Sequence, residues 1–326
     1  MANTKIEWAT KVWNPVTGCT PISSGCANCY AKRMANRLKG RHGYDAADPF
    51  KVTIHPEEKF LEPLKWRKPS NVFVCSMGDL FHKDVPTLEI DKVFAIAAIS
   101  PKHNFMFLTK RPDRMAAYFD TPAKKLAERW EDVIYSMGIS AGDDEIDTVA
   151  SFLHNRCALG WPLKNIWLGV SVEDQKAADD RIHYLNEISA AVKFVICEPL
   201  LSEINFEKSL GESLKWHAGG LKNCISWVIS GGETGPQARP CHPDWVRSLR
   251  DQCKNDGIPF FFKSWGVWVP SLQIVPSLAD KSYIGPIEKS TSKDFFTTTC
   301  CVLQKTNKKI SGDFIDSKQY HEFPKI

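Results

Sequence analysis

The sequence lacks any apolar run long enough to cross a membrane, and it does not open with a secretory signal. No stretch approaches the roughly 20 apolar residues that a membrane-spanning helix needs. The first residues, Met1 to Lys5, lead directly into mixed polar sequence. We therefore expect a cytoplasmic protein without a membrane segment, in a compartment where thiols stay reduced.

The chain also lacks a strong charge of either sign, an internal repeat and a low-complexity tract. Its formal net charge is only +4 over 326 residues. Nucleic-acid-binding proteins usually carry a denser basic stripe. This balance allows a phosphate-bearing partner without requiring one, and the missing repeat excludes a solenoid.

Short apolar runs rich in β-branched and aromatic residues recur along the chain. Several are apolar at nearly every position, which is typical of strands buried on both faces of a parallel sheet. The seven predicted strands are Thr10–Pro15, Asn71–Ser76, Asn104–Thr109, Asn165–Val172, Val192–Cys197, Ser226–Ser230 and Pro259–Lys263.

Helical patterns separate these strands, as at Leu88–Ser100, Asp174–Ala190 and Pro243–Asn255. Alternating strands and helices indicate βαβ units. We predict an α/β protein with a partial TIM-like (β/α) barrel of parallel strands over residues 1–268. A helical insertion follows the third strand, and residues 269–326 form a small irregular C-terminal appendage.

Charged residues next to small ones follow nearly every predicted strand. Active sites of parallel barrels lie at the carboxyl ends of the strands, so these residues predict one polar pocket. The alternative is that some of them, such as Ser171 and Asp174, only cap the following helix. The charged residues at these strand ends are Asp79, Lys110, Arg111, Glu173, Glu198, Glu233 and Lys263.

Three of the 11 cysteines lie within one short segment, as C-x6-C-x2-C at Cys19, Cys26 and Cys29. Thiolates select zinc or iron–sulfur clusters. A structural zinc ion needs four ligands, and the fourth would have to come from His42, His55 or a distant cysteine. A cubane cluster held by three cysteines instead leaves one iron open, as reductive cleavage of S-adenosylmethionine requires.

The residues around these motifs resemble a phage- and bacteria-borne family of three-Cys-motif proteins that are similar to radical-SAM enzymes. The resemblance implies a partial TIM-like barrel, a [4Fe–4S] cluster, S-adenosylmethionine and a distant likeness to spore photoproduct lyase, a DNA-repair enzyme. The matching segments are Trp13–Cys19, Gly25–Ala31, Asp79–His82, Leu108–Pro112, Leu168–Glu173, Glu198–Leu201, Gly231–Gly235 and Phe262–Gly266.

The cysteine segment and the end of the second strand depart from the usual radical-SAM pattern. The first cysteine gap is wider than in C-x3-C-x2-C, and no Gly-Gly-Glu follows the second strand. In the radical-SAM hypothesis Tyr30 contacts the cofactor's adenine. Ser76 and Asp79 then meet its amino group, and Ser171 and Glu173 meet its ribose or carboxylate.

The same hypothesis places Glu198, Glu233 and Lys263 on the substrate side as catalytic residues, with Lys110 and Arg111 ready for a phosphate or carboxylate. The alternative for Glu198 and Lys263 is a buried ion pair across the barrel. The partners would be a nucleic acid or nucleotide substrate and an electron donor such as flavodoxin or ferredoxin.

Two other functions stay open. One is a zinc-containing nucleic-acid-binding protein without catalysis, since basic residues interleaved with aromatic ones suit single strands. The other is an electron-transfer or redox-sensing cluster protein. The basic residues that favour the first are Lys32, Arg33, Arg37, Lys39 and Arg41.

Overall fold

The fold is described from a computed structural model. The described residues are 4, 6–139, 161–211, 220–270, 295–297, 302–305 and 312–324.

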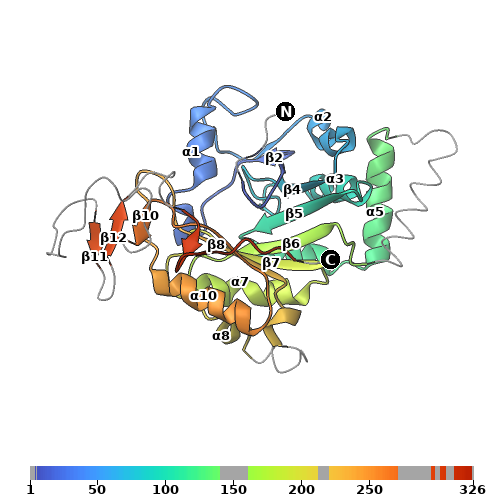
Figure 1. Cartoon of the computed structure of the whole chain (residues 1–326). Helices are drawn as coiled ribbons and strands as arrows, with labels where there is room; N and C mark the ends of the chain where they lie inside the picture. The colour runs from blue at the N-terminus through green and yellow to red at the C-terminus, as the bar shows by residue number, and fades with distance from the viewer. Residues whose placement is uncertain are drawn as a thin grey trace.

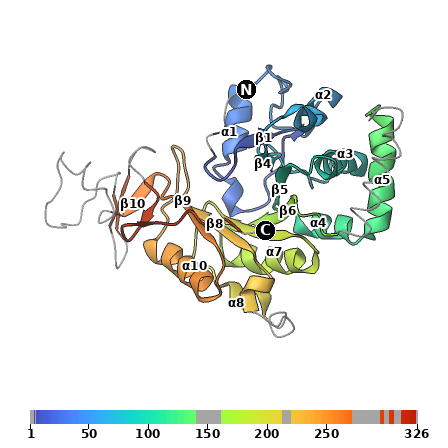
Figure 2. The same cartoon turned by 45° about the vertical axis from the view of Figure 1, so that its right-hand side comes forward.

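A seven-stranded parallel sheet forms the centre of the molecule and curls into a half-barrel (Figures 1 and 2). Its strands are hydrogen-bonded in the order in which they occur in the chain. The predicted fold class is confirmed, and each predicted strand has its counterpart. The strands are β1 (Lys11–Trp13), β4 (Ser70–Val74), β5 (His103–Thr109), β6 (Ile166–Ser171), β7 (Val192–Cys197), β8 (Trp227–Gly231) and β9 (Phe260–Ser264).

The strands are apolar because both of their faces are covered. Every residue of β6 is buried. On the concave face, Trp8 from the N-terminal segment packs with Trp227 of β8, their ring centroids 6.5 Å apart. The Trp167 ring of β6 meets the Trp227 ring edge-on, with the ring centroids 6.1 Å apart. These indoles fill the inside of the half-barrel, so any cavity has to open toward the strand ends.

Helices cover the convex face of the sheet. Asp174 caps one of them, α7, by accepting a hydrogen bond from the Ala177 backbone N–H, so the capping alternative holds for this residue. Two helices, α4 and α5, follow β5 as the predicted insertion, whose residues 140–160 lie outside the described ones. The helices are α1 (Tyr30–Arg37), α2 (Glu57–Phe60), α3 (Thr87–Ala98), α4 (Pro112–Phe119), α5 (Ala123–Ser136), α7 (Gln175–Glu187), α8 (Phe206–Leu210) and α10 (Pro243–Asn255), with 3-10 turns at Ser24–Cys26, Glu62–Lys65 and Gly220–Asn223.

Short antiparallel strands make up the described parts of the C-terminal region. They are β10 (Trp268–Pro270), β11 (Phe295–Thr297) and β12 (Val302–Lys305) in one sheet, and β13 (Phe314–Ile315) and β14 (Lys318–Gln319) in another.

The end of the chain returns to the half-barrel. His321 forms an antiparallel bridge with Phe261 of β9, and the Trp265 indole N–H donates to the Phe314 carbonyl at 2.9 Å. Ile315 is fully buried in the main core. The division at residue 268 stays a prediction, but residues 312–324 are packed on the barrel.

Within the described residues, no helix combines the length and the apolar character that a membrane crossing would require.

Candidate functional site

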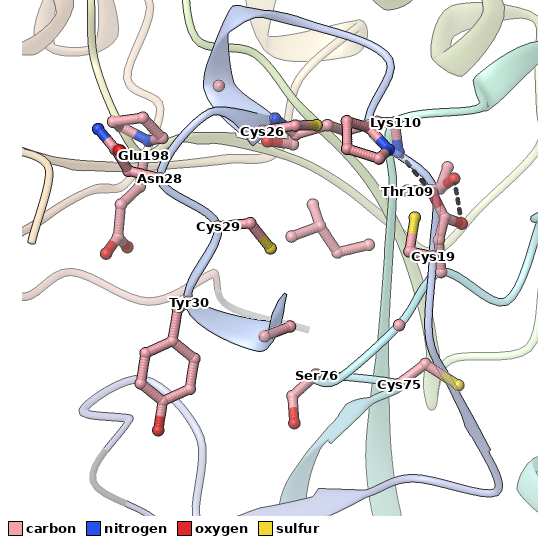
Figure 3. A pocket seen from close by; sticks show the side chains of 18 of the residues that line it. Cys19, Cys26, Asn28, Cys29, Tyr30, Cys75, Ser76, Thr109, Lys110 and Glu198 are labelled. Atoms are coloured by element: carbon pink, nitrogen blue, oxygen red, sulfur yellow. Dashed lines mark hydrogen bonds between the residues drawn. The ribbon is translucent and has the colours of Figure 1, made fainter. Parts of the chain in front are cut away.

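A cavity of about 270 Å³ lies at the carboxyl ends of the parallel strands. The cysteine segment between β2 (Val16–Thr17) and α1 forms one side of it, and the loops after β4 to β8 form the others (Figure 3). The predicted pocket therefore exists. The predicted site residues that line it are Cys19, Cys26, Cys29, Tyr30, Ser76, Asp79, Ser171, Glu198 and Glu233.

Backbone contacts hold the cysteine segment against the sheet. Strand β2 pairs with β3 (Thr53–Ile54), and the Cys19 N–H donates to the Phe50 carbonyl at 3.1 Å. Gly18 has a φ of +84°, and a Cβ there would lie 1.9 Å from the Lys51 carbonyl oxygen. A side chain at this position would push the first cysteine out of the cavity wall.

The three cysteines line the same cavity. Figure 3 shows the sulfurs of Cys19 and Cys29 directed into the cavity, with Cys26 beside Lys110. Burial, reinforced by the Asp79 carboxylate, raises the pKa of Cys19 to about 11. Burial also opposes a charged Cys26, but the Lys110 ammonium and hydrogen bonds hold its pKa below the ordinary value. The two thiols therefore have different electrostatic surroundings.

The three thiols line one cavity without forming a ready-made site for a metal ion among the described residues. Among the described residues, no three His, Cys, Asp or Glu side chains are close enough to bind one metal ion. A cubane takes one thiolate per iron, so its ligands stand farther apart than those of one zinc ion. His42 and His55 are absent from the cavity lining. His55 Nε2 instead shares a hydrogen bond with Thr17 Oγ1 at 2.9 Å.

A fourth thiol, Cys75, lies in the cavity wall. It follows β4 with a φ of +53°, which is unusual for a residue with a side chain. Burial raises its pKa to about 12. Figure 3 shows its sulfur turned away from that of Cys29, so it does not complete a ligand set.

The Asp79 carboxylate is saturated by protein donors. Its Oδ1 accepts from the Phe81 N–H at 3.0 Å and from Thr109 Oγ1 at 2.7 Å. Its Oδ2 accepts from the Lys110 N–H at 3.2 Å and from Arg111 Nη1 at 2.9 Å. A carboxylate offers about four acceptor sites. Asp79 thus joins the loops after β4 and β5 and has no acceptor site to spare for a ligand.

Glu173 is also fully engaged, and it does not line the cavity. The side chain is 0% exposed and pairs with Arg181 of α7 at 2.9 Å and with Lys110 at 3.3 Å. Its Oε1 also accepts from the Gly25 N–H at 3.4 Å. A Cβ on Gly25 would lie 2.6 Å from Lys110 Nζ. Glu173 therefore docks the cysteine segment onto β6.

Glu233 links the loop after β8 to the cysteine segment. Arg239 donates to both of its oxygens, with Nη2 to Oε1 at 2.6 Å and Nε to Oε2 at 2.9 Å. Asn28 Nδ2, between the second and third cysteines, donates to Oε2 at 3.0 Å. Burial alone would raise the pKa of Glu233, but these bonds lower it.

Glu198 and Lys263 form an ion pair between the ends of β7 and β9, as the alternative for these residues expects, but the pair is only partly buried, with side chains 21% and 18% exposed. Lys263 donates to Oε1 of Glu198. Among the described contacts no donor reaches Oε2, and Glu198 lines the cavity. Of the predicted carboxylates on the cavity wall, Glu198 has the largest unused acceptor capacity.

The other predicted residues lie at the rim or on the wall. Tyr30, at the start of α1, is 60% exposed, and Ser76 Oγ donates to Asn14 Oδ1 at 3.2 Å. The sequence patterns did not indicate Asn28, a partner of Glu233 from 205 residues away, or the nearer partners Arg181 of Glu173 and Arg239 of Glu233. The only sequence signal for Arg181 is its place on the helix that follows Glu173.

Comparison with known proteins gives a family and a distant structural likeness. No curated protein matches the chain. Two structures of spore photoproduct lyase with dinucleoside spore photoproduct, one of them a mutant, align with a TM-score of 0.42 and 10% identity. The alignments cover 94% of this chain and 71% of the lyase chain. A family model described as "Protein of unknown function (DUF5131)" matches residues 3–324, and the chain therefore belongs to that family.

Proposed function

We propose that this protein is an iron–sulfur enzyme of radical-SAM type. Cys19, Cys26 and Cys29 would bind a [4Fe–4S] cluster, and S-adenosylmethionine would occupy the adjoining cavity. The observation that carries the proposal is that three thiols from one short segment line the same cavity as the polar strand ends of a parallel half-barrel.

The number of thiols is central to this proposal. When bound, a cluster with three protein thiolates supplies an electron and an open iron for reductive cleavage of S-adenosylmethionine. The protein's own part is to hold the segment that carries the three cysteines against the cavity. The contacts of Asn28 with Glu233 and of Gly25 with Glu173 do this at the two ends of the Gly25–Asn28 segment.

The cavity wall supports a division of roles among the predicted residues. Ser76 and Ser171 place hydroxyl-bearing residues on the wall for the polar groups of the cofactor, and Tyr30 stands at the rim for the adenine. Glu198 is the proposed catalytic carboxylate because its Oε2 is available to a ligand. Lys263 orients Glu198 through their ion pair. Glu233 holds the loops together through Arg239 and Asn28.

Anaerobically purified wild-type protein is expected to contain about four irons per chain and a reducible cluster signal in EPR. Adding S-adenosylmethionine should shift that signal because the cofactor binds the open iron. Stoichiometric zinc without iron would contradict the proposal and favour the zinc-containing nucleic-acid-binding protein. A cluster whose EPR signal does not change when S-adenosylmethionine is added would favour the electron-transfer alternative.

We also propose a nucleic acid or nucleotide as the substrate, with flavodoxin or ferredoxin as the electron donor. Helix α1 starts at the cavity rim with Tyr30 and carries basic residues along its length. Among the described ion pairs, none involves Lys32, Arg37 or Lys39, so these cations are available to phosphates.

Replacing Lys32, Arg37 and Lys39 together by glutamine is expected to weaken binding of a fluorescent single-stranded oligonucleotide. The slope of log K against log salt is negative, and its magnitude should fall by about 0.7 for each phosphate that the variant no longer neutralises. The matched control is Lys124→Gln with Lys125→Gln, since both lysines are exposed on α5. Equal salt slopes for both variants and the wild type would argue against a phosphate-bearing substrate on α1.

A further inference from the structure

The Arg111 guanidinium contacts a cysteine sulfur directly. Arg111 lies between β5 and α4, and its Nη1 is 3.3 Å from Cys19 Sγ. The same nitrogen donates to Asp79 Oδ2 at 2.9 Å. Its Nη2 donates to the Thr20 carbonyl at 2.9 Å and to Thr20 Oγ1 at 3.2 Å. The guanidinium thus bridges Cys19 and the residue after it.

Buried groups fix Arg111 in this position. Asp79 is itself held by three other donors and cannot follow a moving guanidinium. Behind Thr20 lies His82, which is fully buried. His82 Nδ1 accepts from the Asp84 N–H at 3.2 Å, so a neutral ring carries its proton on Nε2. That Nε2–H donates to Thr20 Oγ1 at 2.8 Å and orients the threonine toward Arg111.

We propose that Arg111 is a positioning residue that raises the reduction potential of the cluster through its hydrogen bond to Cys19. The inference rests on the proposed function. A cluster with thiolate ligands is anionic and gains a further negative charge on reduction. Hydrogen bonds to its sulfurs and nearby positive charge therefore favour the reduced form.

Asp79 makes the effect of removing Arg111 larger. Its carboxylate lies near Cys19, since one nitrogen, Arg111 Nη1, contacts both Asp79 Oδ2 at 2.9 Å and Cys19 Sγ at 3.3 Å. In the native protein Arg111 lies next to both groups and offsets this charge. Without the guanidinium, the cluster would have an uncompensated carboxylate nearby and one sulfur without its donor. Both changes make reduction of the cluster less favourable.

The neighbouring Lys110 has a different role. Its ammonium lies 3.3 Å from Glu173 and 3.4 Å from Ser23 Oγ, and within the described part of the chain it makes no hydrogen bond to a sulfur. The sequence grouped Lys110 and Arg111 as sites for a phosphate or carboxylate. Their contacts instead assign Lys110 to the docking of the cysteine segment and Arg111 to the sulfur of Cys19.

The test is an EPR-monitored redox titration of the purified holoprotein, with Arg111→Gln and Arg111→Lys compared with wild type. Arg129→Gln is the matched control, since Arg129 also pairs with a buried aspartate, Asp91, at 2.6 Å. Helix α5, which carries Arg129, contributes nothing to the cavity lining. Iron content and far-UV circular dichroism are measured first on every variant.

The expected result is a more negative midpoint potential in Arg111→Gln, a smaller shift in Arg111→Lys and no shift in Arg129→Gln. Loss of iron from Arg111→Gln alone, with Arg111→Lys shifted and intact, would also support the role. Potentials equal to wild type in both Arg111 variants would overturn it while leaving the proposed function in place. A wild-type protein without iron would instead remove the proposed function, and this inference with it.

Discussion

Replacing Cys26 by alanine is expected to abolish cluster binding, from about four irons per chain to fewer than one. Cys26 is one of the three proposed ligands, and the nearby Lys110 ammonium favours its thiolate form. Two remaining thiols cannot hold a cubane around an open iron. The S-adenosylmethionine-dependent EPR shift should vanish with the iron.

The same substitution should leave the folded protein almost unchanged. Cys26 is only half-buried, so its truncation removes little packed apolar surface and should cost less than about 1 kcal/mol. The matched control is Cys224→Ala, since Cys224 is buried in the core away from the cavity lining. Its iron content should equal that of wild type. Full iron occupancy in Cys26→Ala would contradict the assigned ligand set.

Replacing Glu173 by alanine is expected to destabilise the protein by about 3–5 kcal/mol. The substitution leaves the Arg181 guanidinium buried without its carboxylate and removes the partner of Lys110. It also frees the Gly25 N–H, which docks the cysteine segment. Urea denaturation followed by tryptophan fluorescence measures the change in the free energy of unfolding.

This prediction separates a structural role from the cofactor contact that the sequence suggested for Glu173. The control, Glu203→Ala, removes an exposed carboxylate and should change stability by less than about 0.5 kcal/mol. A Glu173→Ala protein of wild-type stability that has lost only its affinity for S-adenosylmethionine would instead restore the cofactor contact. The expected result is that Glu173→Ala loses both stability and bound iron.

The sequence predicted the architecture well because hydrophobic period and strand length are local properties. Runs such as Phe260 to Phe262 are apolar at each position, and this alone indicates a strand covered on both faces. Helix α10 has the predicted bounds, Pro243–Asn255, because proline suits its first turn and the apolar spacing continues to its end. The spacing of Cys19, Cys26 and Cys29 likewise identified the cavity wall.

The roles of the charged strand ends could not be predicted in the same way. In the sequence, Asp79, Glu173, Glu198 and Glu233 are alike, since each follows a buried strand. What distinguishes them is how many donors reach each oxygen, and several of these donors come from distant segments, as Arg111 does for Asp79 and Asn28 for Glu233. Those contacts depend on the curvature of the sheet and on the docking of the cysteine segment.

Sequence by itself therefore determined the half-barrel, the order of its strands and the three thiols at its mouth. Only the tertiary structure decided that Asp79 and Glu173 are saturated anchors, that Glu198 keeps an acceptor for a ligand, and that Arg111 faces the sulfur of Cys19. The physical reason is the sequence separation over which each kind of interaction acts. Apolar periodicity depends only on residues that are close together in the sequence. The partner of a buried charge depends instead on which distant segments the fold brings within hydrogen-bonding distance.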